Sequence, residues 1–199
     1  MRNEDISTTN GTAVISPADD VIAGSRGQWT VTYTAGPEGL AVGGSVRFEI
    51  PYGFTPPQCQ WPGDDGHVVA TCSRRDVRLR LSLQPPVTLD PEPFYYVTRW
   101  GRMVYAQVLD QPLTEGDQIV FVYGRLLHSP LAGGAVAQHF AQTVEFTVAT
   151  DADGTRAAKF SGYTLVADQP RLTVIGGALH RRRFVSPSLV TAHEPFTTR

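Results

Sequence analysis

Apolar and polar residues alternate with a period of two in several segments of the chain. In residues 29–35 every second side chain is apolar and the intervening three are threonines. Residues 46–52 and 77–83 repeat the pattern, with Arg47 and Glu49 on the polar side of the first of them. Successive side chains of a β-strand point to opposite faces. The pattern therefore predicts antiparallel strands with one face buried and the other in water.

Further strands are predicted between frequent turn signals. The chain has 19 glycines and 15 prolines without a fixed period, which excludes collagen and disfavours long helices. Residues 136–144 also fit a helical period, but the surrounding pattern favours a strand. Residues 119–123 are apolar on both phases, which indicates a central strand. The other expected strands are 13–16, 68–72, 102–109, 118–123, 142–150 and 171–175. The sequence thus predicts an all-β fold, an Ig-like antiparallel β-sandwich with long Pro-rich loops.

The expected domain organisation is a single sandwich with two extensions. We predict a flexible N-terminus at 1–12, the β-sandwich at 13–180, and a C-terminal strand or extended tail at 181–199. A hydrophobic fraction of 41% in 199 residues is enough for one buried core. No internal repeat is visible.

Charge and hydropathy limit the possible partners and the compartment. Lys and Arg number 17 against 19 Asp and Glu, so the net charge is −2, and no basic excess points to nucleic acid. No apolar run reaches the ~18 residues that would cross a membrane. Residues 1–7 lack the apolar core of a signal peptide. We therefore expect a soluble, cytoplasmic protein, unless a leader has been removed.

The cysteines and histidines give no metal signature. Cys59 and Cys72 flank a Pro-Gly-Asp-Asp-Gly turn, so they either remain free thiols or face each other across a hairpin. Free thiols are the expected state in a reducing compartment. None of the five histidines is paired at metal-ligand spacing. No metal or other cofactor is expected.

Two Pro-rich stretches, residues 52–65 and 83–100, are the expected ligand-binding loops. Long loops on a sandwich often carry binding residues. Trp61 lies in the first stretch, and the second ends with an aromatic and arginine cluster. Such a cluster suits carbohydrate, anion or protein contact, or packs at the edge of the core. The candidate ligand-binding residues are Trp61, Tyr95, Arg99, Trp100 and Gln142. Gln142 shares the strand phase of Phe140 and Val144, so its amide is expected either to satisfy loop backbone or to face a pocket.

Several motifs in colinear order resemble one known family. They are residues 16–36, 43–48, 56–58, 113–119, 138–140, 144–148 and 154–155. They resemble the N-terminal β-sandwich of a bacterial family of unknown function, and the resemblance covers residues from about 14 to 175. Members of that family carry a C-terminal PHP-like metallo-phosphoesterase domain. The resemblance implies the sandwich fold but transfers no metal ligands, because the chain contains no His-x-His motif.

Two functions follow as hypotheses. The first is a non-catalytic binding or accessory domain that contacts another protein chain or domain, or a small-molecule ligand; a homo-oligomer is also possible. The second is a small stand-alone enzyme with a loop-built pocket, in which His139 is the acid/base and Tyr95 or Arg99 orients an oxygenated or anionic substrate. The family-like pattern has a small hydroxyl residue where His139 stands. A carbohydrate-binding module is a third reading, with Trp61 and Trp100 as its platform.

Overall fold

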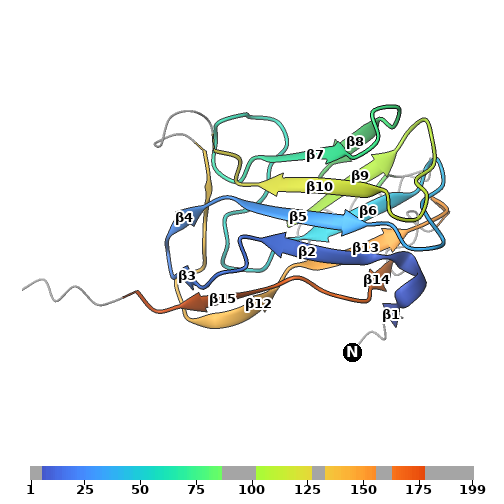
Figure 1. Cartoon of the computed structure of the whole chain (residues 1–199). Coiled ribbons are helices and arrows are strands. Elements are labelled where there is room, and N and C mark those ends of the chain that lie inside the picture. Colours follow the sequence, from blue (N-terminus) through green and yellow to red (C-terminus); the bar gives the residue numbers. More distant parts are fainter. Residues whose placement is uncertain (1–5, 87–101, 127–132, 156–162, 178–199) are drawn as a thin grey trace, which may run out of the picture.

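Two antiparallel β-sheets packed face to face form the framework of the molecule (Figure 1). The computed structural model describes residues 6–86, 102–126, 133–155 and 163–177. The four-stranded sheet has the order β2 (Thr12–Ser16), β5 (Trp29–Thr34), β10 (Gln118–Tyr123) and β7 (Val68–Cys72). The six-stranded sheet has the order β1 (Ile6–Ser7), β14 (Thr164–Val166), β13 (Thr147–Asp151), β6 (Ser45–Glu49), β9 (Met103–Val108) and β8 (Leu79–Ser82).

Two smaller sheets lie at one end of this sandwich. The first pairs β11 (Ala135–Val136) with β4 (Arg26–Gly27). The second has the order β12 (Gln142–Glu145), β15 (Arg171–Ile175) and β3 (Val21–Ile22). A short 3-10 helix, η1 (Thr8–Asn10), precedes β2. Parallel pairing occurs between β1 and β14 and between β15 and β3, and the other strand pairs of the described residues are antiparallel.

The all-β, Ig-like antiparallel β-sandwich predicted from the sequence is confirmed. Strands β7, β10 and β15 have the predicted bounds, and β5 ends one residue before the predicted segment. Residues 119–123 lie on β10 between β5 and β7, as their two apolar phases indicate. Five short strands, β1, β3, β4, β11 and β14, were not predicted, because two or three residues are too few to show a period.

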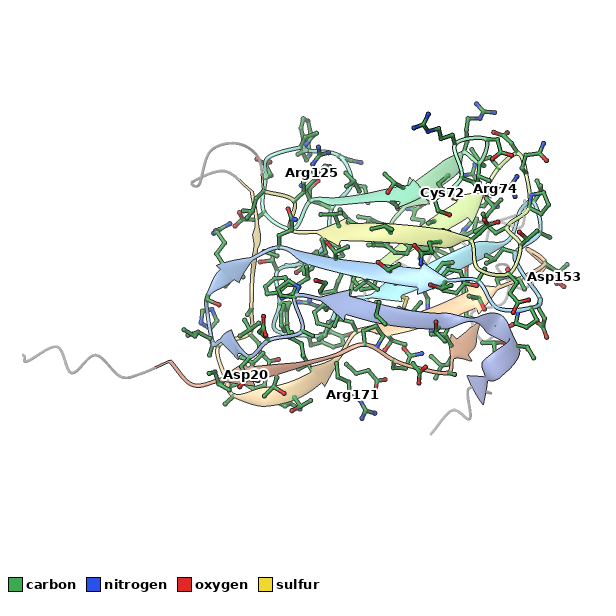
Figure 2. All side chains as sticks on the ribbon, in the orientation of Figure 1. Asp20, Cys72, Arg74, Arg125, Asp153 and Arg171 are labelled. Carbon is green, nitrogen blue, oxygen red and sulfur yellow. The ribbon has the colours of Figure 1, made fainter. Side chains whose placement is uncertain are left out.

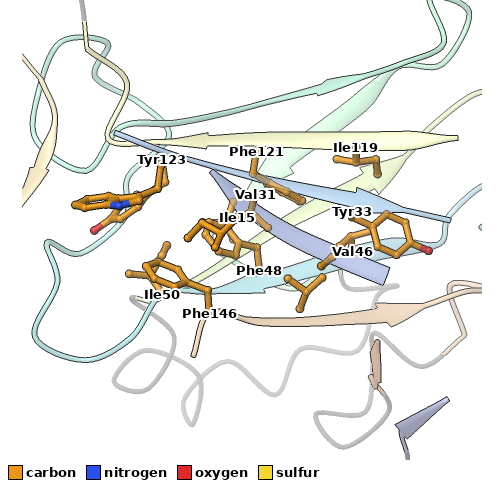
Figure 3. Packing of buried hydrophobic residues seen from close by; sticks show 14 of the residues in the cluster. Ile15, Val31, Tyr33, Val46, Phe48, Ile50, Ile119, Phe121, Tyr123 and Phe146 are labelled. Carbon is orange, nitrogen blue, oxygen red and sulfur yellow. The ribbon is translucent and has the colours of Figure 1, made fainter. Parts of the chain in front are cut away.

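Aromatic rings from both sheets fill the space between them (Figure 3). Phe48 of the six-stranded sheet lies 5.4 Å from Phe121 of the four-stranded sheet, measured between ring centroids. Trp29 stacks on Tyr123 at 5.9 Å. Phe54 belongs to a loop, yet it is buried edge-on against Trp29 at 5.4 Å. The core therefore extends from the strands into the loop after β6.

The prediction that Arg47 faces water is wrong. Its side chain is only 4% exposed, and its guanidinium carbon lies 5.1 Å from the centre of the Tyr163 ring. Tyr163 and its neighbour Tyr105 belong to a second cluster of buried side chains, with ring centroids 5.7 Å apart. Arg47 is opposite Tyr105 in the β6–β9 register, so this cluster covers the outer face of β6. A strand buried on both faces can still alternate in polarity when a cation packs on an aromatic ring.

The apolar phase of 46–52 stops before its predicted end. Ile50 is buried, but Tyr52 is 68% exposed. Pro51 has no backbone N–H with which to extend the ladder, and β6 ends at Glu49. The alternation at Tyr52 is therefore a coincidence of spacing.

The predicted strand 142–150 is two strands, and its buried phase begins later than expected. β12 pairs with β15, whereas β13 pairs with β6 and β14, so the chain changes sheets at Phe146. Val144 and Phe146 are buried, but Phe140 is 55% exposed because it precedes β12. Gln142 is also exposed. Gln142 is the first residue of β12, and the expectation that its amide is buried on the phase of Val144 is wrong.

Candidate functional site

Several loops meet at one end of the sandwich, on the left of Figure 1. We call this region the loop end and define it as residues 21–28, 51–67, 124–126, 133–141 and 175–177. Backbone hydrogen bonds join its segments. Gly24 N donates to Gln138 O at 3.0 Å, Thr55 N to Val136 O at 3.0 Å, and Gly66 N to Gly134 O at 2.7 Å. The loops therefore form one connected surface.

Exposed aromatic side chains concentrate on the loop end. Among the described residues, the large apolar side chains that are exposed to solvent are Val14, Ile22, Val42, Tyr52, Trp61, Leu109, Leu126, Phe140 and Ile175. Six of these nine lie on the loop end, including all three aromatic ones: Tyr52, Trp61 and Phe140. An aromatic group in water is more informative than a scattered exposed aliphatic residue, because it marks a candidate contact surface.

Trp61 lies in a closed turn, residues 58–67, which we call the Trp61 turn. The amide side chain of Gln58 holds the backbone of Trp61 from both sides. Its Nε2 donates to Trp61 O at 2.7 Å, and its Oε1 accepts from Trp61 N at 2.8 Å. Oε1 also accepts from Gln60 N at 2.9 Å. The indole is 65% exposed on a backbone that a neighbouring side chain fixes.

Tyr52 is held in a similar way by Arg102, which directly precedes β9. The Arg102 guanidinium donates to Pro51 O at 2.8 Å and to Phe54 O at 2.9 Å. These carbonyls flank Tyr52 in sequence. The guanidinium carbon also lies 5.1 Å from the centre of the Tyr52 ring, within the range of a cation–π contact. Arg102 thus fixes the backbone around Tyr52 and covers one face of its ring.

Phe140 is held by Gln138. The buried side chain of Gln138 donates from Nε2 to Phe140 O at 3.0 Å, while its Oε1 is buried without a hydrogen-bond partner. A Cβ added to Gly53 would lie 2.8 Å from the Cβ of Gln138, so the 51–67 loop packs directly on this side chain. All three exposed aromatics therefore stand beside backbone that an amide or guanidinium group holds.

A polar contact links the Trp61 turn to the rest of the loop end. Arg26 makes a two-pronged ion pair with Asp65 and donates to Gly133 O at 2.8 Å. The hydrogen bond from Arg26 lowers the pKa of Asp65. This contact joins β4, the Trp61 turn and the loop before β11.

The predicted catalytic residue, His139, is on the loop end and is exposed. Its ring rests on Gly24, where an added Cβ would lie 2.8 Å from the imidazole Nδ1. Gly24 has φ +72°, a conformation that a residue with a side chain rarely adopts. The position beneath the His139 ring therefore favours glycine, because a side chain on Gly24 would collide with the imidazole.

The other predicted site residues divide between three places. Trp61 is on the loop end, as is His139. Gln142 is on β12, exposed beside the loop end and outside it. Tyr95, Arg99 and Trp100 lie outside the described residues. Tyr52 begins the predicted loop 52–65, but neither it nor Phe140 was named as a candidate, because the alternation assigned both to a buried phase.

The two cysteines are free and distant from each other. Gln58 faces His67, so Cys59 lies beside Val68. Cys72 is four residues further along β7, roughly 13 Å away at the rise of a strand, and a disulfide needs Cα atoms within about 7 Å. Burial raises the pKa of the Cys59 thiol to about 11, which disfavours the reactive thiolate at neutral pH.

Figure 2 labels arginines and aspartates at both ends of the molecule, among them Arg74, Arg125, Asp20 and Asp153. Within the described ranges, no three His, Cys, Asp or Glu side chains are close enough together to hold a metal ion. The same part of the chain contains no helix that is long and apolar enough to cross a membrane.

In comparisons with known proteins, no family model and no curated protein matches this chain. Its function therefore has to be argued from the geometry of the loop end.

Proposed function

We propose that this protein is a non-catalytic β-sandwich binding domain and that it contacts another protein chain or domain through the loop end. One observation carries the proposal. Tyr52, Trp61 and Phe140 are all exposed, and each stands beside backbone held by a side chain of another residue. A backbone that is fixed before binding loses little conformational entropy when a partner covers the rings that it carries.

The chemistry of this face suits a protein partner. Tyr and Trp are enriched among the residues that dominate protein–protein binding energy. The exposed parts of the three rings add up to roughly 400 Å², taking about 150–250 Å² for a whole aromatic side chain. Exposed Asp64 and Arg125 lie on the same end and supply a polar rim.

The family resemblance suggests one kind of partner. A sandwich that precedes a metallo-phosphoesterase domain has a catalytic domain as its neighbour. A domain of that class is the partner that we propose to test first, either on the same polypeptide or on another one.

The experiment compares Trp61→Ala with a matched control. Val14 on β2 is exposed to a similar degree, at 61%, and lies away from the loop end, so Val14→Ala removes exposed apolar surface elsewhere. A partner captured from the source organism is identified by mass spectrometry, purified and titrated against each variant. We expect at least a tenfold weaker Kd for Trp61→Ala and no change for Val14→Ala. Wild-type affinity in Trp61→Ala, Tyr52→Ala and Phe140→Ala would contradict the proposal.

The alternative function is a small enzyme that uses His139. The specific observation in its favour is that the His139 imidazole is exposed on the loop end and rests on Gly24, where substrate would have access to it. Any turnover found in a screen of small oxygenated and anionic substrates should then be lost in His139→Ala. Undiminished turnover in that variant would exclude the acid/base role of His139.

A further inference from the structure

His67 stands at the base of the Trp61 turn and joins it to the end of β10. Gln58 and His67 face each other in a parallel bridge, and Gln58 N donates to Gly66 O at 3.0 Å. On its other side, His67 O accepts from Gly124 N at 2.9 Å and from Arg125 N at 3.1 Å. Any displacement of His67 therefore loosens both closures of the turn that carries Trp61.

The side chain of His67 is buried in its neutral form. It is 4% exposed, and its Nδ1 is buried without a hydrogen-bond partner. Burial, and secondarily the positive charge of Arg125, hold the pKa of His67 below the ordinary histidine value. A protonated ring would place a second cation near Arg125, with no acceptor for its Nδ1 proton and little access to water.

The other charged and titratable groups around the turn do not supply the missing acceptor. Asp65 is paired with Arg26, and Asp64 is exposed on the turn itself. Cys59, beside the bridge, has a pKa raised by burial to about 11 and stays a neutral thiol at neutral and acidic pH. His139 is exposed on the same end and is not part of the bridge that closes the turn. His67 is thus the described group whose protonation puts an uncompensated charge under the Trp61 turn.

We infer that His67 is a pH-sensitive latch: its protonation opens the Trp61 turn and releases Trp61 from its fixed position on the loop end. The consequence for binding rests on the proposed function of the loop end. In the open turn His67 is solvated, with an ordinary pKa of about 6.5. The closed turn binds the proton more weakly, so it is fully stable above that pH and loses stability as the pH falls below it. The opening constant rises by up to about tenfold per pH unit, until the pH reaches the lower pKa of the closed form.

Amide hydrogen exchange tests this inference directly. Protection factors, corrected for the intrinsic pH dependence of exchange, are measured from pH 7.5 to 5 for the amides of Trp61, Gly124 and Arg125. We expect them to fall up to tenfold per pH unit below about pH 6.5. The amides of Gly116 and Asp117, at the opposite end of the sandwich, should not change and serve as an internal control. Constant protection of the first group would overturn the inference.

Three variants separate His67 from other causes. His67→Phe keeps a ring of similar size that cannot take up a proton, and should give protection that is independent of pH. His139→Gln should behave like the wild type. If His67→Phe does not fold, Arg125→Gln provides a second test. Removing this cation raises the pKa of His67 in the closed turn. Protection should therefore stop falling at a higher pH, and its total loss should be smaller. A wild-type fall in His67→Phe, or in Arg125→Gln where His67→Phe does not fold, would overturn the inference.

Failure of this inference and failure of the proposed function give different results. If protection falls in acid but Trp61→Ala binds the partner normally, the latch is correct and the loop end is not the contact surface. If Trp61→Ala abolishes binding but protection is independent of pH, the contact surface is correct and the latch is wrong.

Discussion

The two ends of the sandwich hold their turns mainly with different kinds of polar side chain. At the far end, which we define as residues 36–44, 73–78, 109–117 and 151–155, carboxylates hold turns and pair with arginines. Asp117 Oδ2 accepts from Thr114 N at 2.8 Å and also faces Arg74 Nη1 at 3.4 Å. Arg78 pairs with Asp110. At the loop end the amides of Gln58 and Gln138 do the corresponding work, and exposed aromatic rings stand beside them.

This difference shows which end is built for contact. Both ends consist of short turns with glycines at positive φ, so turn formation alone does not explain the aromatic rings. The far end neutralises its charges locally and presents little aromatic surface. At the loop end, side-chain hydrogen bonds fix the backbone beside aromatic rings that remain in water. Fixed apolar groups in water contribute little to folding, so their benefit is expected on binding.

The largest effect is expected from Phe54→Ala, which removes the anchor of the loop end in the core. Phe54 is buried and packs at 5.4 Å against both Trp29 and Phe146. Its loss should destabilise the fold by about 3–5 kcal/mol, through lost burial and the remaining cavity. Urea unfolding measures this change.

Leu113→Ala is the far-end counterpart of that variant. Leu113 is equally buried, and its backbone pairs with Leu40 at 2.8 Å. We expect a loss of about 2–5 kcal/mol, without the drop in partner affinity that Phe54→Ala should cause. Equal effects of both variants on affinity would remove the distinction between the two ends.

The next effect comes from Gly24→Ala, with Gly43→Ala as its matched control. Both glycines have positive φ, +72° and +91°, and each alanine should cost about 1–2 kcal/mol for that reason. An added Cβ at Gly43 meets no atom within 4 Å, whereas at Gly24 it meets the ring of His139 at 2.8 Å. NMR should therefore show shifted His139 ring signals in Gly24→Ala alone. Unshifted signals would mean that the contact is not maintained in solution.

Much of the fold could be predicted from the sequence, because burial on one face leaves a period of two. The pattern in 29–35 identified β5 with an error of one residue at its end. It failed where a strand is covered on both faces, since the polarity of Arg47 does not reveal that Tyr163 packs on it. It also failed at Phe146, where tertiary pairing moves the chain from one sheet to another.

The candidate site was only partly predictable. Trp61 and His139 were singled out, and both are on the loop end. Tyr52 was hidden by an alternation that continues past Pro51, although a proline and a glycine on either side of it are a turn signal. No local pattern could show that Arg102, far along the chain, holds the carbonyls beside Tyr52. Such contacts between distant segments depend on the assembled fold.

A smaller effect is expected from removing one turn-holding side chain at each end. Gln58→Ala deletes three hydrogen bonds to the Trp61 turn, and Asp117→Ala deletes those to Thr114. Each should cost about 1 kcal/mol in urea unfolding. Gln58→Ala should in addition weaken partner binding, since Trp61 loses its fixed backbone. Full affinity in Gln58→Ala would show that fixing this backbone is unimportant for binding.

Acid should act on the two ends in separate pH ranges. Partial burial of Asp117 would raise its pKa, but hydrogen bonds from Thr114 and the contact with Arg74 outweigh it and leave the pKa lowered. A carboxyl with a lowered pKa stabilises the fold above its unfolded value of about 3.9 and loses that contribution as the pH falls through the folded value. Amide exchange at Asp117 should therefore change only below about pH 4, whereas the Trp61 turn responds below about pH 6.5. A common midpoint at both ends would indicate global unfolding instead of local opening.

The smallest difference is expected between the two arginine ion pairs. Arg78 and Asp110 meet at the surface, and such pairs contribute little because water and salt screen them. Arg78→Gln should leave the urea midpoint unchanged.

Arg26 also pairs with a carboxylate at a solvated position, but its Nη1 donates to Gly133 O as well. Arg26→Gln therefore removes a link between three segments of the loop end. We expect a small loss of stability, and faster amide exchange at Gly66, whose N–H donates to Gly134 O at 2.7 Å. Adding salt should leave part of the effect of Arg26→Gln in place, because a hydrogen bond to a carbonyl is screened less than an ion pair. If 1 M salt abolishes the whole difference between the two variants, Arg26 acts on the loop end through its charge alone.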